Sequence, residues 1–218
     1  MINIALDGPS GSGKSTVAKA LSKKLNILYL DTGAMYRACA LKAHRLGIDC
    51  KDVTSVDGFI DSVNIEVKYQ NGSQITMLDG EDVSEKIREN VISLKASAIS
   101  AHMSVRKKLV ELQRQIASST DCVLDGRDIG TNVLPNAKYK FYVTASIDVR
   151  TERRYNELIL KGQTVDKEAL REEIALRDYN DSHREFAPLR QAEDAVLVDT
   201  SNMTIEEVLN FILQKLEK

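Results

Sequence analysis

Cysteine is scarce in this sequence of 218 residues. The three cysteines, Cys39, Cys50 and Cys122, have neither the close spacing of a metal site nor the even number of a disulfide framework. The three histidines also lack the spacing of metal ligands. We therefore expect free thiols in a reducing compartment, and neither a disulfide-stabilised nor a zinc-binding domain.

Long apolar runs and a strong charge of one sign are also missing. No apolar run approaches the length of roughly 20 residues that a membrane-spanning helix needs. No signal peptide precedes the first apolar stretch, so we expect a cytoplasmic protein without a membrane partner. The formal net charge is only -2, so any anion-binding surface must be a local cluster of basic residues. Nucleic acid is not an expected partner, and a monomer is favoured.

Internal repeats, low-complexity tracts and a disordered tail are absent from the sequence as well. Its length suits one domain with insertions, and 43% hydrophobic residues are ample for a core. Apart from the segment at 65–78, the chain alternates apolar stretches of strand length with amphipathic helices. We expect strands over 2–6, 27–30, 121–124, 139–143 and 195–199. The expected helices cover 16–25, 34–46, 55–63, 104–118, 147–161, 166–185 and a last one from 204, where Thr204 and Glu207 form a capping box.

This alternation predicts an α/β fold, with a five-stranded parallel sheet covered by helices. The segment 65–78 interrupts it, because Ile65, Val67 and Tyr69 alternate with polar residues. Asn71-Gly72 is the preferred dipeptide of a tight hairpin turn, and 74–78 supplies the returning strand. We interpret this antiparallel piece as a small inserted β/α subdomain.

A phosphate-binding motif organises the chain. Between the first strand and the first helix lies the segment Gly8-Pro9-Ser10-Gly11-Ser12-Gly13-Lys14-Ser15-Thr16, which fits the P-loop pattern. Its glycines let successive backbone N–H groups turn inward around a phosphate, and the helix that follows directs its positive end at the same anion. Lys14 can reach the β- and γ-phosphates of a bound nucleotide, and the Ser15 hydroxyl can complete a Mg²⁺ shell. The alternative is a flexible glycine turn before a helix.

Arginines form a second group of candidate residues. Arg127 follows a buried strand, where a cation without an anion is costly. Arg177, Asp181 and Arg184 are spaced i, i+4, i+7, which places them on one side of a helix. Each arginine could instead be a solvated charge, and Arg153 and Arg154 could pair with Glu152 and Glu157 on the surface.

Four segments together resemble the bacterial cytidylate kinase family. They are the P-loop, Leu30-Asp31-Thr32-Gly33-Ala34-Met35-Tyr36-Arg37, Asp125-Gly126-Arg127-Asp128, and the Arg177/Asp181/Arg184 helix that leads into Ala187-Pro188-Leu189. The resemblance extends over essentially the whole chain, including the hairpin near 63–98. It implies one P-loop nucleotide-kinase domain over 1–218, with a core of 1–34 and 105–218. The inserted nucleoside-monophosphate region would be 35–104, and a short helical lid would be 150–165.

The resemblance also implies roles for individual residues. The acceptor phosphate of CMP would be held by Arg37, Arg127 and Arg184, and the ribose hydroxyls by Arg177 and Asp181. The cytosine edge would be read by Ser97, Arg106 and Asp128, and Thr32 keeps a hydroxyl at a substrate-binding position. ATP would be held by the P-loop and by the lid residues Arg150, Arg153 and Arg154. Catalytic roles would fall to Lys14, Arg127, Arg184 and Arg153.

The expected reaction moves the γ-phosphoryl group of ATP to CMP or dCMP, with Mg²⁺. The acceptor is already an oxyanion, so the obstacle is the approach of two polyanions, which the cations relieve. The nearest alternative is another P-loop small-molecule kinase, for a different monophosphate or for shikimate. A nucleotide-dependent switch is a further alternative, but the guanine-reading Asn-Lys-x-Asp element does not occur. For Asp128, the alternative to base reading is an ion pair with Arg127 that only shapes the turn.

Overall fold

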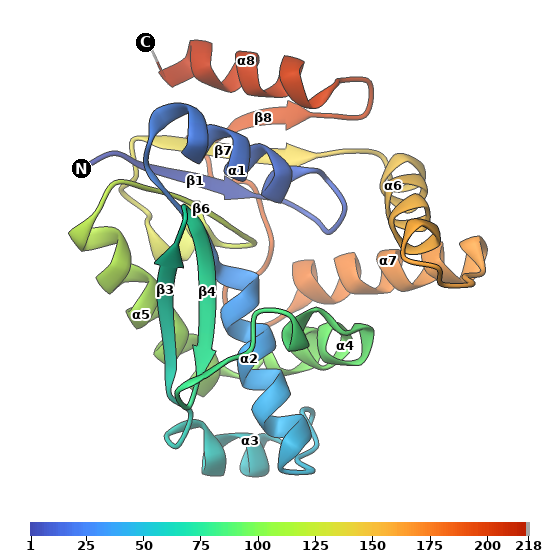
Figure 1. Cartoon of the computed structure of the whole chain (residues 1–218). Coiled ribbons are helices and arrows are strands. Elements are labelled where there is room, and N and C mark those ends of the chain that lie inside the picture. Colours follow the sequence, from blue (N-terminus) through green and yellow to red (C-terminus); the bar gives the residue numbers. More distant parts are fainter. Residues whose placement is uncertain (217–218) are drawn as a thin grey trace. The chain divides into compact units, whose positions relative to one another are not determined.

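The computed structural model describes residues 1–216 (Figure 1). Its strands form a five-stranded parallel sheet in the order β2-β6-β1-β7-β8 and a separate three-stranded antiparallel sheet in the order β3-β4-β5. This confirms the predicted α/β class with a small antiparallel piece. Within residues 1–216, no helix is both long and apolar enough to cross a membrane.

The chain divides into two compact units. We call residues 2–26 and 123–218 the P-loop unit, and residues 27–122 the insert unit, which contains the hairpin. The strands and helices of the P-loop unit are β1 (Asn3–Asp7), α1 (Lys14–Leu25), β6 (Cys122–Gly126), η2 (Ile129–Val133), β7 (Tyr139–Thr144), α6 (Ile147–Leu160), α7 (Lys167–His183), β8 (Val196–Asp199) and α8 (Ile205–Leu216).

In the P-loop unit, β7 lies between β1 and β8 and pairs parallel with both. Helices α1 and α8 pack against one another, and α6 and α7 form a helical hairpin (Figure 1). The hairpin has a small apolar core of its own, made by Leu158, Leu170 and Ile174. Helix α8 begins with the expected capping box, because the Thr204 hydroxyl accepts from the Glu207 N–H and the Glu207 carboxylate accepts from the Thr204 N–H.

The insert unit is built around helix α2. Its strands and helices are β2 (Leu28–Asp31), α2 (Thr32–Arg45), α3 (Val53–Ile60), β3 (Ile65–Gln70), β4 (Ser73–Leu78), β5 (Glu81–Asp82), η1 (Lys86–Arg88), α4 (Asn90–Ile99) and α5 (Met103–Ser119). Helix α2 packs against α3, α4, α5 and strand β4, and its Met35, Ala38 and Cys39 are fully buried.

The hairpin β3–β4 turns where the sequence predicts it. Gln70 pairs with Ser73 across the turn, and Asn71 and Gly72 both have positive φ, at 52° and 74°. These backbone angles match the right-handed twist of the two strands, which is why Asn-Gly is favoured there. The two-residue strand β5 extends this sheet and has no counterpart in the sequence prediction.

Candidate nucleotide-binding site

The P-loop joins β1 to α1 and has the expected backbone conformation. Gly8 has a φ of 151°, and a Cβ at this position would stand 1.9 Å from the carbonyl oxygen of Val143. Gly13 caps α1 with a φ of 86°, and helix α1 begins at Lys14. Only glycine fits at Gly8, so the loop begins in close contact with β7 and its N–H groups can converge on an anion.

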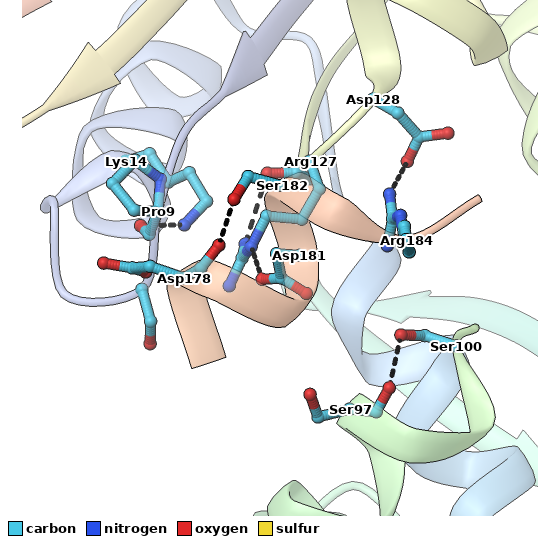
Figure 2. A network of polar contacts seen from close by, with 12 residues as sticks. Pro9, Lys14, Ser97, Ser100, Arg127, Asp128, Asp178, Asp181, Ser182 and Arg184 are labelled. Carbon is cyan, nitrogen blue, oxygen red and sulfur yellow. Dashed lines mark hydrogen bonds and ion pairs between the residues drawn. The ribbon is translucent and has the colours of Figure 1, made fainter. Parts of the chain in front are cut away.

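Lys14 is only 6% exposed, and its Nζ donates a hydrogen bond to the Pro9 carbonyl at 2.9 Å (Figure 2). Burial, together with repulsion from Arg127, lowers the pKa of Lys14 to about 7, although Asp125 opposes the shift. The ammonium therefore lacks a full counter-charge. A bound phosphate would supply one and favour the charged form.

Asp125, in strand β6, touches the P-loop directly. Its carboxylate accepts a hydrogen bond from the Ser15 hydroxyl, and the side chain is buried. The two groups are hard oxygen donors, which is the chemistry that Mg²⁺ prefers, and their juxtaposition at a P-loop matches the metal site of P-loop enzymes. The sequence analysis assigned Ser15 to the metal but missed Asp125. The position of this carboxylate near the carboxyl end of a buried strand could have indicated a metal-binding role.

Arg127 and Asp181 form an ion pair, with the Arg127 Nε 2.8 Å from the Asp181 carboxylate (Figure 2). Burial opposes ionisation of Asp181, but attraction to Arg127, Arg177 and Arg184 outweighs it and lowers the pKa of this carboxyl. Asp181 is therefore held as an anion among three arginines.

Arg184 and Asp128 form a second buried ion pair, at 3.3 Å (Figure 2). Arg184 lies just beyond the last residue of α7, in an extended conformation, and its Nε donates to the Ala187 carbonyl at 2.7 Å. Arg177 and Asp181 lie within α7, whereas Arg184 is its C-terminal cap. Arg177 and Arg184 both lie close enough to Asp181 to lower its pKa, but a single helical face does not explain the position of Arg184.

The arginines of α6 have different surroundings. Arg150 is buried, pairs with Asp178 at 2.6 Å and donates to the Ser10 carbonyl of the P-loop at 3.2 Å. Arg153 donates to Thr200, and its Nη1 lies 3.8 Å from where a Cβ of Gly13 would stand. Arg154 pairs with Glu157, as the surface alternative predicted. Two of the three arginines are thus at the P-loop.

The insert unit holds the other candidate residues. Thr32 is buried at the first position of α2, and Arg37 pairs with Asp31 at 2.9 Å. Arg106 is 1% exposed, and its guanidinium lies over the Tyr36 ring, 5.4 Å from the centroid.

Ser100 connects Arg106 with Ser97 inside the insert unit. The Arg106 Nη1 donates to the Ser100 carbonyl at 3.1 Å. The Ser100 hydroxyl donates to the Ser97 carbonyl at 2.8 Å (Figure 2). The fold therefore brings these two predicted base-reading residues close to one another.

Comparison with known proteins identifies the family. The family model described as cytidylate kinase matches residues 4–218. A cytidylate kinase of Caldicellulosiruptor saccharolyticus is 49% identical over 213 residues, which cover 98% of this chain and 94% of the relative. A cytidylate kinase of Streptococcus pneumoniae is 48% identical over 218 residues, which cover 100% of this chain and 98% of the relative.

Among solved structures, the shikimate kinase of Bacteroides thetaiotaomicron has a TM-score of 0.52 at 14% identity, and the match covers 100% of this chain and 99% of that one. This likeness shows the P-loop kinase fold alone. The sequence matches go further, because they extend over nearly the full length at high identity. The chain therefore belongs to the cytidylate kinase family and is an ATP-dependent nucleoside-monophosphate kinase.

Proposed function

We propose that the chain moves the γ-phosphoryl group of ATP to CMP or dCMP with the predicted site residues in the roles described below. The observation that carries the proposal is electrostatic: Lys14 of the P-loop is close enough to Arg127 and Arg177 for both to lower its pKa. The P-loop unit therefore gathers cations around two places at once, one for the donor phosphates and one for a second anion. A monophosphate acceptor provides that second anion.

In the P-loop unit, Arg127 and Arg184 bind the acceptor phosphate, while Arg177 and Asp181 bind the ribose hydroxyls. In the structure, Arg127 is paired with Asp181 and Arg184 with Asp128. Binding replaces these ion pairs by contacts to the phosphate, the ribose and the base. Each buried charge thus has a partner before and after binding, which avoids the cost of an uncompensated charge.

In the insert unit, Arg37 binds the acceptor phosphate, Thr32 contributes its hydroxyl to substrate binding, and Ser97 and Arg106 read the cytosine edge. Asp128 of the P-loop unit reads the cytosine amine. We assign the acceptor nucleotide to the inserted region 35–104 and the cover over ATP to the lid 150–165. These assignments extend the family match to individual residues.

Phosphoryl transfer needs no catalytic base here, because the acceptor phosphate is an oxyanion at neutral pH. Lys14 follows the charge on the moving phosphoryl group, Arg127 and Arg184 hold the acceptor, and Arg153 stands close to Gly13 to compensate the same charge. Arg150 and Arg154 assist in holding ATP. In addition, Arg150 supports the P-loop through its bond to the Ser10 carbonyl.

Mg²⁺ fits the oxygen pair formed by Ser15 and Asp125. Ser15 would be a direct ligand and Asp125 would lie in its surroundings. When bound, Mg²⁺ neutralises charge on the β- and γ-phosphates of ATP. The other partners that we propose are small nucleotides and not nucleic acid. We also propose that the chain is a monomer.

Turnover against a panel of acceptors at equal ATP tests the proposal. CMP and dCMP should be phosphorylated with the highest kcat/KM, above UMP, AMP, dTMP and shikimate. Reaction should stop when Mg²⁺ is removed by a chelator and return when it is restored. Faster turnover of any other acceptor would contradict the proposed substrate class.

A further inference from the structure

Asp7 is a buried carboxylate that has no role in the proposed reaction. It is the last residue of β1, directly before Gly8, and is only 5% exposed. Its Oδ1 accepts from the Ile129 N–H and its Oδ2 from the Gly130 N–H, each at 2.7 Å. Both oxygens are therefore engaged by two successive backbone donors, which is a strong and directional contact for an ionised carboxylate.

The two donors open the π-helical turn η2, which comes immediately after Arg127 and Asp128. Within this turn, the Asp128 carbonyl accepts from the Asn132 and Val133 N–H groups at 2.9 and 3.1 Å. The Asp128 carboxylate accepts from the Asn132 Nδ2 at 2.8 Å. The turn that Asp7 holds thus fixes both the backbone and the side chain of Asp128. A single π-helical turn of this kind is often found at functional sites.

We propose that Asp7 is a positioning residue that orients Arg127 and Asp128 for the acceptor nucleotide. The inference rests on the roles proposed above for these two residues. Asp7 precedes the first glycine of the P-loop, and its carboxylate binds the first two N–H groups of η2, the turn that follows Arg127-Asp128. One side chain therefore sets the acceptor-binding segment relative to the donor-binding loop, and an error of about 1 Å in such an arrangement can cost roughly 100-fold in rate.

The Lys140 side chain packs closely against this contact. A Cβ on Gly130 would stand 3.1 Å from the Lys140 Cδ and 3.4 Å from the Asp7 Oδ2. The Lys140 amine is itself occupied, since it donates to the Pro135 carbonyl and pairs with Asp194 at 2.7 Å. The two N–H groups are thus the direct partners of Asp7 that define its position.

Ionisation of Asp7 determines how well it can hold the turn. Burial raises its pKa to about 7, and nearby Asp128 adds to this, while the two N–H bonds and Lys14 oppose it. Lys140 and Tyr142 are the titratable groups that β7 brings to the same place. A protonated carboxyl keeps one good acceptor and turns its hydroxyl toward an N–H donor. The contact between Asp7 and the two N–H groups therefore weakens in acid.

Asp7→Asn tests the inference, because its amide accepts one of the two bonds and opposes the other donor. We expect the KM for CMP to rise at least about tenfold and the CMP over UMP preference to fall, with the KM for ATP changed less than about threefold. Asp61→Asn, at an exposed carboxylate, is the matched control and should change neither. Urea unfolding of each variant establishes that it is folded under assay conditions.

The pH dependence separates positioning from a merely structural role. The ratio of kcat/KM for CMP, wild type over Asp7→Asn, should rise as the pH passes through about 7. Taking the ratio cancels the titration of CMP itself, whose phosphate also ionises in this range. A flat ratio, or an equal rise in KM for CMP and ATP, overturns the inference.

Gly130→Ala provides a second test if Asp7→Asn does not fold, because its methyl group would stand 3.1 Å from the Lys140 Cδ, so that the turn held by Asp7 or the Lys140 chain must shift. We expect the same selective rise in the KM for CMP, and an unchanged KM in a folded variant overturns the inference. Arg127→Ala and Asp128→Asn distinguish the two levels of the argument. If they alter CMP binding while the Asp7 and Gly130 variants do not, only the inference fails. If they leave CMP binding unchanged, the proposed residue roles fail and take the inference with them.

Discussion

At the scale of single residues, the charged groups of the proposed acceptor site form ion pairs with one another. Asp128 shows the consequence most clearly. One of its oxygens lies 3.3 Å from Arg184 and the other accepts from Asn132 at 2.8 Å. The alternative of an ion pair between Asp128 and Arg127 does not describe these contacts, since Arg127 pairs with Asp181. Asp128 is thus held as an acceptor in a defined orientation, as base reading requires.

Asp128→Asn should reduce the preference for CMP over UMP. An ionised carboxylate only accepts hydrogen bonds, so it favours the cytosine amine and opposes the uracil carbonyl, whereas an amide can donate to that carbonyl. We expect the ratio of kcat/KM for the two substrates to fall by roughly 10- to 100-fold. Asn132→Ala is the comparison, because it removes one bond that supports Asp128 but keeps its charge, so the ratio should fall less than in Asp128→Asn. An unchanged ratio in Asp128→Asn would show that the base is read elsewhere.

At the scale of elements, the hairpin β3–β4 holds the edge of β2 through side chains. The Gln74 amide makes two bonds to one residue: its Oε1 accepts from the Asp31 N–H at 2.7 Å, and its Nε2 donates to the Asp31 carbonyl at 3.3 Å. The Asp31 carboxylate in turn caps α2 through the Ala34 N–H and pairs with Arg37, both at 2.9 Å. Gln74 therefore supports the position of Arg37 through Asp31.

Gln74→Leu should therefore weaken CMP binding without affecting ATP. The substitution leaves the N–H and the carbonyl of Asp31 without these partners, so the start of α2 can shift together with Arg37. We expect the KM for CMP to rise roughly three- to tenfold and the KM for ATP to stay constant. Tyr69→Phe is the matched control, because it removes the bond from the same hairpin to the Tyr29 carbonyl, away from Arg37. An equal effect of the two variants would contradict a specific role of Gln74.

The elements were largely predictable because their signals are local. The Asn-Gly turn, the apolar strands and the capping box of α8 were all confirmed from patterns within a few residues. Helices α2 and α3 begin two residues earlier than predicted, since Asp31 and Asp52 cap them and apolar spacing does not show a cap. Strand β5 and the π-helical turn η2 are too short to have a period, so only tertiary contacts define them.

The site was predictable where it consists of motifs and unpredictable where it consists of contacts between them. The P-loop and the arginines are recognised from their own sequence. Asp7 meets Ile129 across 122 residues, and Ser15 meets Asp125 across 110 residues. No local pattern in the sequence indicates such pairings. The resemblance placed Arg150 in the lid over ATP, and no local pattern indicated that the fold buries it against the Ser10 carbonyl of the P-loop.

At the scale of the whole molecule, buried charges make stability depend on pH in two opposite directions. Asp181 has a lowered pKa, so its contribution to stability is present above the ordinary pKa of an aspartate and is lost in acid. Asp7 has a raised pKa, so folding favours its protonated form. Its contribution is therefore greatest below its ordinary value of 3.8 and is lost as the pH rises toward about 7. The measured stability of the protein contains both effects.

Comparing wild type with Asp7→Asn isolates the second effect, because Asp181 and all other groups are common to both. The neutral amide does not titrate, so the free energy of unfolding of the wild type should fall relative to the variant between pH 4 and 8, by up to about 4 kcal/mol for full ionisation. Urea denaturation followed by circular dichroism measures this, since the chain has no tryptophan to follow by fluorescence. If the Asp7→Asn curve runs parallel to that of the wild type, Asp7 ionises at an ordinary pKa. In that case, burial of the ionised Asp7 carboxylate does not lower the free energy of unfolding.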